Sequence, residues 1–316
     1  MELSRRGVLA LALGSATAAL VGPALPARAT PNSSVRSLGQ LNRFPGDPGV
    51  SRLYYGAKVY DPLMPWESRL GRRLSVHRSF YQAYQMDLLV GQARRDLRHG
   101  RLPHVSTKPP STWGSVATGQ DDAWLRLLAD RLRQLGGPVF FTIHHEPEDN
   151  AIGSGMQPQD FVAMTSRVVS IFSLRAPNVS VVPVLMSWTF DERSGRNPAE
   201  WFVPSAPVFG VDIYNPWSQT NGSPWESFDS QLQDTVKYAH GLPIAVGEYG
   251  CRTDPSNPGR AADWMRDAFD SARANNVVSM SYFNTWENAP DGTWELDAER
   301  ERVFAAKLAS DFVARP

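Results

Sequence analysis

The stretch Val139-Phe140-Phe141-Thr142-Ile143-His144-His145-Glu146-Pro147 has the pattern of a buried strand that ends where a loop begins. Five apolar or β-branched residues come first, and polar residues and a proline follow. A second stretch, Pro243-Ile244-Ala245-Val246-Gly247-Glu248-Tyr249-Gly250, repeats the pattern. Each strand therefore delivers one glutamate at its carboxyl end. Bringing a carboxylate toward an apolar interior costs several kcal/mol unless something uses or pairs it, so the two strands suggest a paired-carboxylate site.

Similar apolar runs recur along the chain and predict eight strands. They begin near Leu53, Leu74, Leu102, Val139, Val179, Val208, Pro243 and Val277. Helix-period segments lie between them at residues 83–98, 122–135, 158–174, 225–240, 260–275 and 297–313, while the connections after the first and fifth strands are less clearly helical. Strands that alternate with helices predict parallel βαβ units, and eight of them favour a closed (β/α)8 TIM barrel of the α/β class.

An open doubly wound sheet is the alternative fold. It is weakened because no glycine-rich phosphate turn follows the first strand, where the sequence runs Gly56-Ala57-Lys58-Val59-Tyr60. The barrel is expected to be a single catalytic domain over residues 51–316. Residues 30–50, rich in Ser, Pro, Gly and Asn, are expected to be a leader segment.

The first 29 residues have the layout of a twin-arginine signal peptide. Ser4-Arg5-Arg6 precedes an apolar run over residues 8–21, and Ala27-Arg28-Ala29 supplies a small-x-small cleavage pattern. We therefore expect export to the extracellular space and no membrane attachment after cleavage. An uncleaved membrane anchor is the alternative, although the run is short for a membrane span of roughly 20 residues.

Charge and cysteine content narrow the possible partners. The chain has 32 basic and 32 acidic residues, a formal net charge of zero, so it has no electrostatic footprint for nucleic acid or an anionic membrane. Cys251 is the only cysteine, which excludes an intrachain disulfide, and we expect it to be a buried structural thiol. We expect a monomer whose partner is a polysaccharide or oligosaccharide substrate.

The positions of Glu146 and Glu248 predict a chemistry. Active sites in these barrels lie at the carboxyl ends of strands, and the two glutamates end the fourth and seventh predicted strands. Hydrolysis of a glycosidic bond with retention needs two carboxyl groups about 5–5.5 Å apart, one an acid and the other a nucleophile. An acid must hold its proton near neutral pH, whereas a nucleophile must stay ionised and needs hydrogen-bond donors.

In these features the chain resembles the clan A glycoside hydrolases from about residue 50 to the end. His145-Glu146 and Gly247-Glu248-Tyr249-Gly250 are most similar to family 26, the β-mannanase family; most clan members carry Asn-Glu at the first position. The resemblance implies that Glu146 is the general acid/base and Glu248 the nucleophile. It also implies that a tyrosine and an arginine support them.

Tyr214 and Arg78 are the candidates for these supporting roles, since we expect them to end the sixth and second strands. Tyr214 could instead pack under a loop, and Arg78 could form a structural ion pair. Asp212 and Glu287, further acids near strand ends, are expected to be solvated or salt-bridged.

Tryptophans give a separate indication of a sugar cleft, because flat aromatic rings suit the apolar C–H faces of sugars. Seven of the ten follow predicted strands: Trp66, Trp113, Trp188, Trp217, Trp225, Trp286 and Trp294. Any single one of them is more often loop core than a sugar platform, but seven clustered on one face favour a carbohydrate cleft. Trp286 closes the eighth predicted strand, where the clan places the platform for the sugar being cleaved, and Trp217 is a second candidate for substrate binding.

The adjacent histidines His144 and His145 also invite a metal interpretation. They lack a His-Glu-x-x-His pattern, and neighbouring strand residues point to opposite faces, so one ion cannot easily be shared. We expect His145 to orient Glu146 or contact the sugar, and the proposed chemistry needs no metal and no cofactor. A metal-dependent hydrolase remains an alternative.

The leading expectation is a secreted retaining endo-glycosidase that hydrolyses a β-linked polysaccharide by double displacement, and endo-β-1,4-mannanase is its first candidate activity. Three further functions stay open at this point. A β-glucanase or a β-xylanase would use the same two glutamates as an endo-β-1,4-mannanase, with different loop contacts. A non-catalytic carbohydrate-binding barrel would keep the tryptophans but would have no reason to hold two strand-end glutamates.

Overall fold

A computed structural model describes residues 43–60, 62–289 and 291–316. The expected signal peptide and most of the expected leader, up to residue 42, lie outside the described residues. No helix in the described ranges is long and apolar enough to cross a bilayer.

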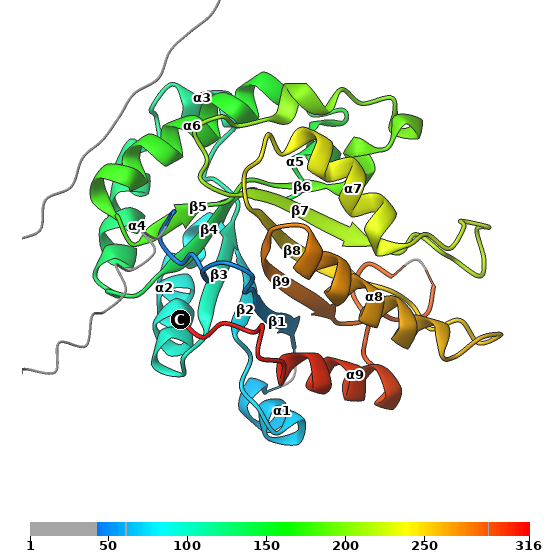
Figure 1. Ribbon diagram of the computed structural model, residues 1–316. Helices are drawn as coiled ribbons and strands as arrows, with labels where there is room; N and C mark the ends of the chain where they lie inside the picture. Colours follow the sequence, from blue (N-terminus) through cyan, green and yellow to red (C-terminus); the bar gives the residue numbers. More distant parts are fainter. Residues whose placement is uncertain (1–42, 61, 290) are drawn as a thin grey trace, which may run out of the picture. The chain divides into compact units, whose positions relative to one another are not determined.

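Each predicted strand is present, and every strand pair is parallel. The strands of the described part are β1 (Tyr54–Val59), β2 (Val76–Tyr81), β3 (Leu102–Thr107), β4 (Val139–Ile143), β5 (Val179–Val181), β6 (Val184–Met186), β7 (Phe209–Tyr214), β8 (Ile244–Gly250) and β9 (Val277–Asn284). Their order in the sheet is β5-β4-β3-β2-β1-β9-β8-β7-β6. The predicted fold class is confirmed (Figure 1).

The two edge strands, β5 and β6, are halves of one strand interrupted at Val182 and Pro183. Hydrogen bonds from both neighbours bridge the interruption: Val182 N donates to Phe141 O at 2.8 Å, and Gly210 N donates to Pro183 O at 2.8 Å. The residues between the two edges therefore contact β4 on one side and β7 on the other, which closes the sheet into a barrel. Proline has no N–H to donate, which explains why the ladder breaks there.

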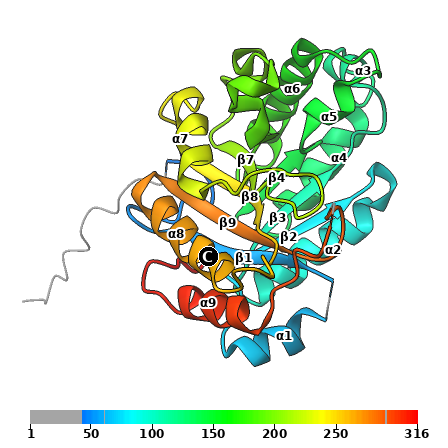
Figure 2. The same cartoon turned by 90° about the vertical axis from the view of Figure 1, so that its right-hand side faces the viewer.

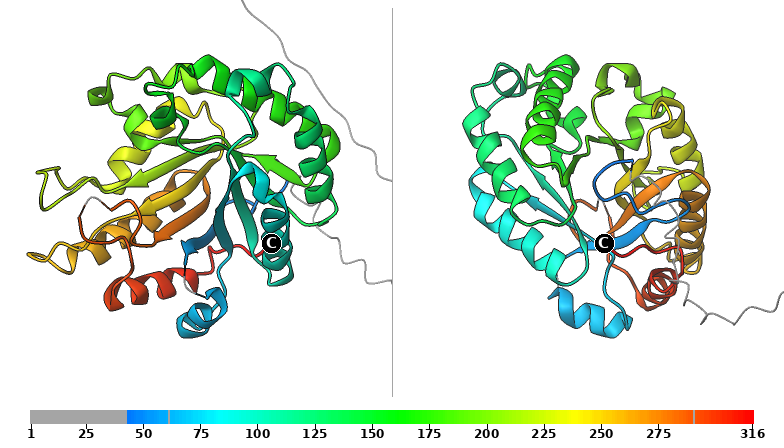
Figure 3. Two further views of the ribbon diagram at one scale, coloured as in Figure 1. Left: turned by 180° about the vertical axis from the view of Figure 1, so that it is seen from behind. Right: turned by 60° about the vertical axis from the view of Figure 1, so that its left-hand side comes forward.

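Helices pack around the outside of the curled sheet (Figures 1 and 3). They are α1 (Leu63–Leu70), α2 (Met86–Arg98), α3 (Trp113–Ala117), α4 (Asp122–Arg133), α5 (Pro147–Ala151), α6 (Pro158–Arg175), α7 (Phe228–Tyr238), α8 (Arg260–Ala274) and α9 (Ala298–Leu308). All six predicted helices are present. The connection after β6 consists of 3₁₀ turns instead: η2 (Ser187–Phe190), η3 (Glu192–Ser194) and η4 (Pro198–Trp201).

The outer core lies between sheet and helices, and α2 shows why. Its apolar residues Met86, Leu89, Val90 and Ala93 recur at helical spacing and are all buried. Further round the barrel, α9 packs on β1 and α8 packs on β9 (Figure 2). Cys251 is buried in this outer core as expected.

The inside of the barrel changes from apolar to polar along the strands. A cluster that includes Tyr54, Val76, Leu102 and Phe140 fills the amino-terminal half. Because side chains alternate between the two faces of a strand, Arg78 shares the inner face of β2 with Val76. The apolar plug thus supports a polar layer at the carboxyl ends, where sites form in this fold.

Candidate active site

A cleft of about 760 Å³ opens at the carboxyl ends of the strands. Its lining contains five of the seven side chains predicted for the site: Arg78, His145, Glu146, Tyr214 and Glu248. They come from β2, the β4–α5 junction, β7 and β8, so residues far apart in sequence meet in one place. The fold therefore brings both predicted carboxyl groups to a single cleft.

Glu146 reaches the cleft because the backbone after β4 turns sharply. His144 and Glu146 have φ values of 57° and 48°, in the left-handed region that non-glycine residues rarely adopt. Hydrogen bonds fix the turn, since His144 N donates to Thr107 O and Glu146 N donates to Val184 O, each at 2.9 Å. Strained backbone of this kind clusters at functional sites, where the surrounding structure holds it.

Glu248 is positioned by an irregularity in β8 at Gly247. The register between β7 and β8 shifts there, because Val211 pairs with Val246 and Asp212 with Glu248. A Cβ atom on Gly247 would lie 2.6 Å from Asp212 Oδ1. A side chain at position 247 would therefore displace the carboxyl group of Asp212.

The surroundings give the two glutamates different proton affinities. Burial raises the pKa of Glu146 to about 8, and the charges of Glu248, Glu148 and Asp149 add to the effect. Burial also raises the pKa of Glu248, but Arg78, Tyr214 and Lys58 oppose the increase. Tyr214 Oη donates to Glu248 Oε2 at 2.5 Å. The arrangement thus favours a protonated Glu146 beside an ionised Glu248.

Arg78 lies in the middle of β2, so the prediction that it ends the second strand is wrong. The strand continues to Tyr81 because its pairing with β3 extends to Tyr81 and Thr107. The Arg78 side chain is fully buried, and Nη1 donates to Ser106 Oγ at 2.6 Å. Nε and Nη2 bond no described residue. Its charge instead acts on the carboxyl groups of Glu248, Asp212 and Glu146.

Asp212 is a third acid beside the pair, and the expectation that it is solvated or salt-bridged is wrong. Its side chain is buried, and neither carboxyl oxygen bonds a described residue. Burial, together with the charges of Glu248 and Glu146, holds the pKa of Asp212 well above its usual range. These surroundings favour the neutral form of Asp212, which limits the negative charge around Glu248.

The two histidines point to different places. Trp113 Nε1 donates to His144 Nδ1 at 2.7 Å, and His144 Nε2 lies 2.9 Å from Asn150 Oδ1, so this ring is occupied by structural contacts. His145 lines the cleft, and its ring centroid lies 4.8 Å from that of Phe80. Within the described ranges, no three His, Cys, Asp or Glu side chains are grouped as a metal site.

The tryptophans do not gather on one face. Trp66 and Trp113 are buried in the core. Trp217 packs against Trp225, with 6.0 Å between the centroids of the two rings. Trp286 lies beyond the end of β9 and is 66% exposed. Neither Trp217 nor Trp286 is among the residues that line the cleft. Trp294 is the tryptophan that does, with its ring centroid 4.8 Å from that of Tyr214.

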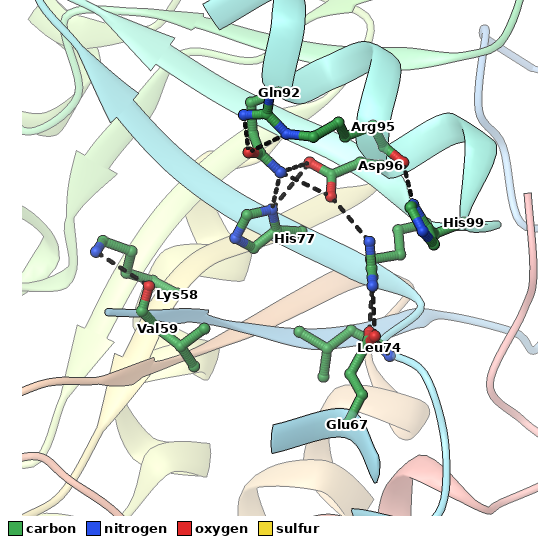
Figure 4. Close-up of polar contacts among 10 residues, drawn as sticks. Lys58, Val59, Glu67, Leu74, His77, Gln92, Arg95, Asp96 and His99 are labelled. Carbon is green, nitrogen blue, oxygen red and sulfur yellow. Dashed lines mark hydrogen bonds and ion pairs between the residues drawn. The ribbon is translucent and has the colours of Figure 1, made fainter. Parts of the chain in front are cut away.

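The cleft also has polar lining residues that the sequence patterns did not single out: Lys58, His77 and Arg252. Glu287, the other acid expected near a strand end, lines it as well. His77 is held from behind, where its Nδ1 lies 2.8 Å from Asp96 Oδ2, and Gln92 Nε2 donates to the same carboxylate (Figure 4). Arg101 completes this network by pairing with Asp96 and Glu67. This charged network ties α2 to β2 behind the cleft. Lys58 could have been found from the sequence, because it is a charged residue inside the otherwise uncharged and buried strand β1.

Solved structures with the same fold are numerous, although no family model and no curated protein sequence match this chain. The GH26 domain of the Prevotella bryantii endo-β-mannanase/endo-β-glucanase PbGH26-GH5A has a TM-score of 0.56 at 11% identity, over 84% of this chain and 91% of that chain. A modular endo-β-1,4-mannanase from Cellulomonas fimi has a TM-score of 0.55 at 14% identity, over 84% of this chain and 72% of that chain. XacCel5A in complex with cellopentaose has a TM-score of 0.60 at 11% identity, over 81% of this chain and 99% of that chain. The expected resemblance is thereby confirmed at the level of the fold.

Proposed function

We propose that this chain is a retaining endo-glycosidase that hydrolyses a β-linked polysaccharide, with β-1,4-mannan as the first candidate. The observation that carries the proposal is the pair Glu146 and Glu248, which share one cleft and have surroundings that separate their pKa values. Titratable pairs with separated proton affinities are the basis for assigning acid and nucleophile.

The geometry supports a double displacement. In the first step a carboxylate oxygen of Glu248 forms a bond to the anomeric carbon, the glycosidic C–O bond breaks, and Glu146 gives its proton to the leaving oxygen. In the second step Glu146 takes a proton from water, the water oxygen attacks the anomeric carbon, and the bond to Glu248 breaks. Tyr214 donates to Glu248 Oε2, so it steadies the carboxylate that forms and leaves.

Mannan is favoured by the residues of the site. The His145-Glu146 pair is the feature most similar to family 26, and the solved mannanases named above share the fold. A β-glucan or a β-xylan is the alternative substrate, since the same two glutamates serve any of these polymers.

Product analysis on a panel of β-mannan, β-glucan and β-xylan tests the proposal. We expect release of oligosaccharides of several lengths from mannan, with the first products keeping the β configuration. Binding of a polysaccharide without any product would instead indicate a non-catalytic carbohydrate-binding barrel. Loss of activity on removal of a metal ion would indicate the metal-dependent alternative.

We further propose that the protein is exported through its twin-arginine-type signal and acts outside the cell as a monomer. The Ser4-Arg5-Arg6 pattern and the following apolar run support the export. Amino-terminal sequencing of the secreted protein should give Thr30 as the first residue, and mass measurement in solution should give one chain. Retention of the mature-length protein in the cytoplasm would contradict the export.

The pH profile of kcat/KM should have an alkaline limb set by Glu146. Burial raises the pKa of this group to about 8, and only its protonated form can donate to the leaving oxygen. Activity should therefore be kept below pH 8 and should fall about tenfold per pH unit above it. Steady-state rates between pH 4 and pH 10 provide the check. A profile that stays flat to about pH 9.5, well above the pKa of about 8, would contradict Glu146 as the acid.

Replacing Tyr214 by phenylalanine should move the acidic limb of the same profile to higher pH. The hydroxyl stabilises the ionised form of Glu248, so its loss raises the pKa of the nucleophile further. We expect kcat/KM at neutral pH to fall by about 10- to 100-fold, the scale of one buried hydrogen bond to a charged group. Tyr238→Phe on α7 is a matched control. If the acidic limb of the pH profile does not move in Tyr214→Phe, the hydroxyl has no effect on the pKa of Glu248.

A further inference from the structure

A second cavity adjoins the cleft on the side of β6 and β7. It has a volume of about 600 Å³ and shares Glu146, Met186, Tyr214 and Pro216 with the cleft. We call this cavity the side lobe. Because the two cavities meet at Glu146, a chain that passes the candidate acid can continue from one into the other.

The placement of the two glutamates indicates which cavity receives the leaving part of the substrate chain. Glu248 lines the cleft but not the side lobe, whereas Glu146 lines both. In a double displacement the sugar attacked at its anomeric carbon must lie against the nucleophile, and the acid lies beside the glycosidic oxygen, on the side of the leaving group. The leaving part of the chain therefore extends past Glu146 and away from Glu248, which is the direction of the side lobe.

The lining of the side lobe suits a sugar. Trp188, Met186, Pro216 and Pro224 supply apolar surface. Asp191, Glu226 and Asp234 supply carboxylate groups that can accept hydrogen bonds from hydroxyls. An apolar surface with a polar rim matches a pyranose, which has C–H faces and hydroxyl edges.

Trp188 is the one tryptophan in this lining, and the other aromatic ring, Tyr214, is shared with the cleft. It lies on η2, directly after β6, and is 42% exposed. The guanidinium carbon of Arg193 lies 5.4 Å from its ring centroid. Arg193 is itself fixed, since it donates to both carboxyl oxygens of Asp191 and to Glu226 Oε1 at 2.6 Å. An exposed ring held from one side is preorganised for stacking on the other.

We propose that the side lobe binds the leaving-group sugars and that Trp188 is the platform on which the first of them stacks. The inference rests on the proposed function and deepens it by assigning a specificity-determining residue outside the carboxylate pair. A lobe on each side of the bond being cut accounts for attack within a chain rather than at its end.

The test compares two substrates that differ in the leaving group: a β-1,4-linked mannohexaose, which leaves as an oligosaccharide, and a β-mannobiosyl fluoride, which leaves as a single fluoride ion. Trp188→Ala should lower kcat/KM for the hexaose about tenfold, the size of one lost stacking contact. For the fluoride, whose leaving atom has no ring to stack on Trp188, the change should stay under about twofold. Trp188→Tyr should restore most of the loss.

The outcomes separate this inference from the proposed function. If the wild-type protein cleaves neither substrate nor the matching glucan and xylan probes, the function itself fails. If the wild-type cleaves both and Trp188→Ala loses nothing on the hexaose, or loses equally on both substrates, the assignment of the platform is overturned. Tyr84→Ala removes an aromatic ring that is 85% exposed and lines neither cavity, so it is the control for surface aromatic loss.

Discussion

Replacing Glu248 by alanine is expected to abolish turnover while the barrel stays folded. Water cannot take the place of the missing carboxylate, because no covalent intermediate can form, so kcat should fall by on the order of 10⁴–10⁶-fold, the scale seen when an enzyme loses its nucleophile. The fold should survive, since the substitution removes a buried acid whose burial raises its pKa and is therefore unfavourable to its charged form.

Azide should then restore part of the activity of Glu248→Ala. The small anion fits the space left by the carboxylate, attacks the anomeric carbon from the same side and yields an α-glycosyl azide, the inverted product. Rates with an aryl glycoside, with and without azide, and product configuration by NMR provide the measurement. Glu295→Ala, an exposed acid outside the cleft, is the control. Near-normal turnover in a folded Glu248→Ala protein would remove Glu248 from the mechanism.

Replacing Glu146 by alanine should give a loss that depends on the leaving group. Polysaccharide needs a proton on its leaving oxygen, so its hydrolysis should fall by about 10²–10⁴-fold or more. An aryl glycoside with an acidic leaving group needs no such proton, so formation of the glycosyl-enzyme should be nearly unaffected, and a burst of aryl alcohol should precede a slow steady state.

The alkaline limb of the pH profile should disappear in the same variant, because the group whose pKa is about 8 has been removed. Stopped-flow and steady-state rates on both substrates, across pH, give the comparison. Equal losses on polysaccharide and aryl glycoside would argue that Glu146 is structural, or that the two glutamates have exchanged roles.

The parts of the fold that the sequence predicted are those with a strong local signal. Strands of a parallel barrel are buried on both faces, so they form short apolar runs such as the one at Val139, and all eight were found. Glu146 and Glu248 stood out because a carboxylate at the end of such a run is costly without a purpose. Both indeed line one cleft.

The features that the sequence did not predict depend on loop geometry and on contacts between residues that are distant in the sequence. The polarity of Arg78 suggested a strand end, but pairing with β3 carries β2 three residues further, to Tyr81. The tryptophans follow strands as predicted, yet whether a ring faces the cleft is decided by the loop that carries it. Trp294 lines the cleft, and Trp286, eight positions earlier, does not. The buried, unpartnered carboxyl of Asp212 could not be foreseen, because it depends on the bulge at Gly247.

The measurement that tests the central claim most directly is the mass of the peptide that carries a trapped glycosyl group. A 2-deoxy-2-fluoro glycosyl fluoride of the preferred sugar should form the covalent intermediate and slow its hydrolysis, so that the enzyme loses activity as one sugar is attached. The account predicts that, after proteolysis, the added mass lies on Glu248. Labelling of Asp212, whose carboxyl oxygens also lack partners beside the cleft, or inactivation without any attached sugar, would contradict it.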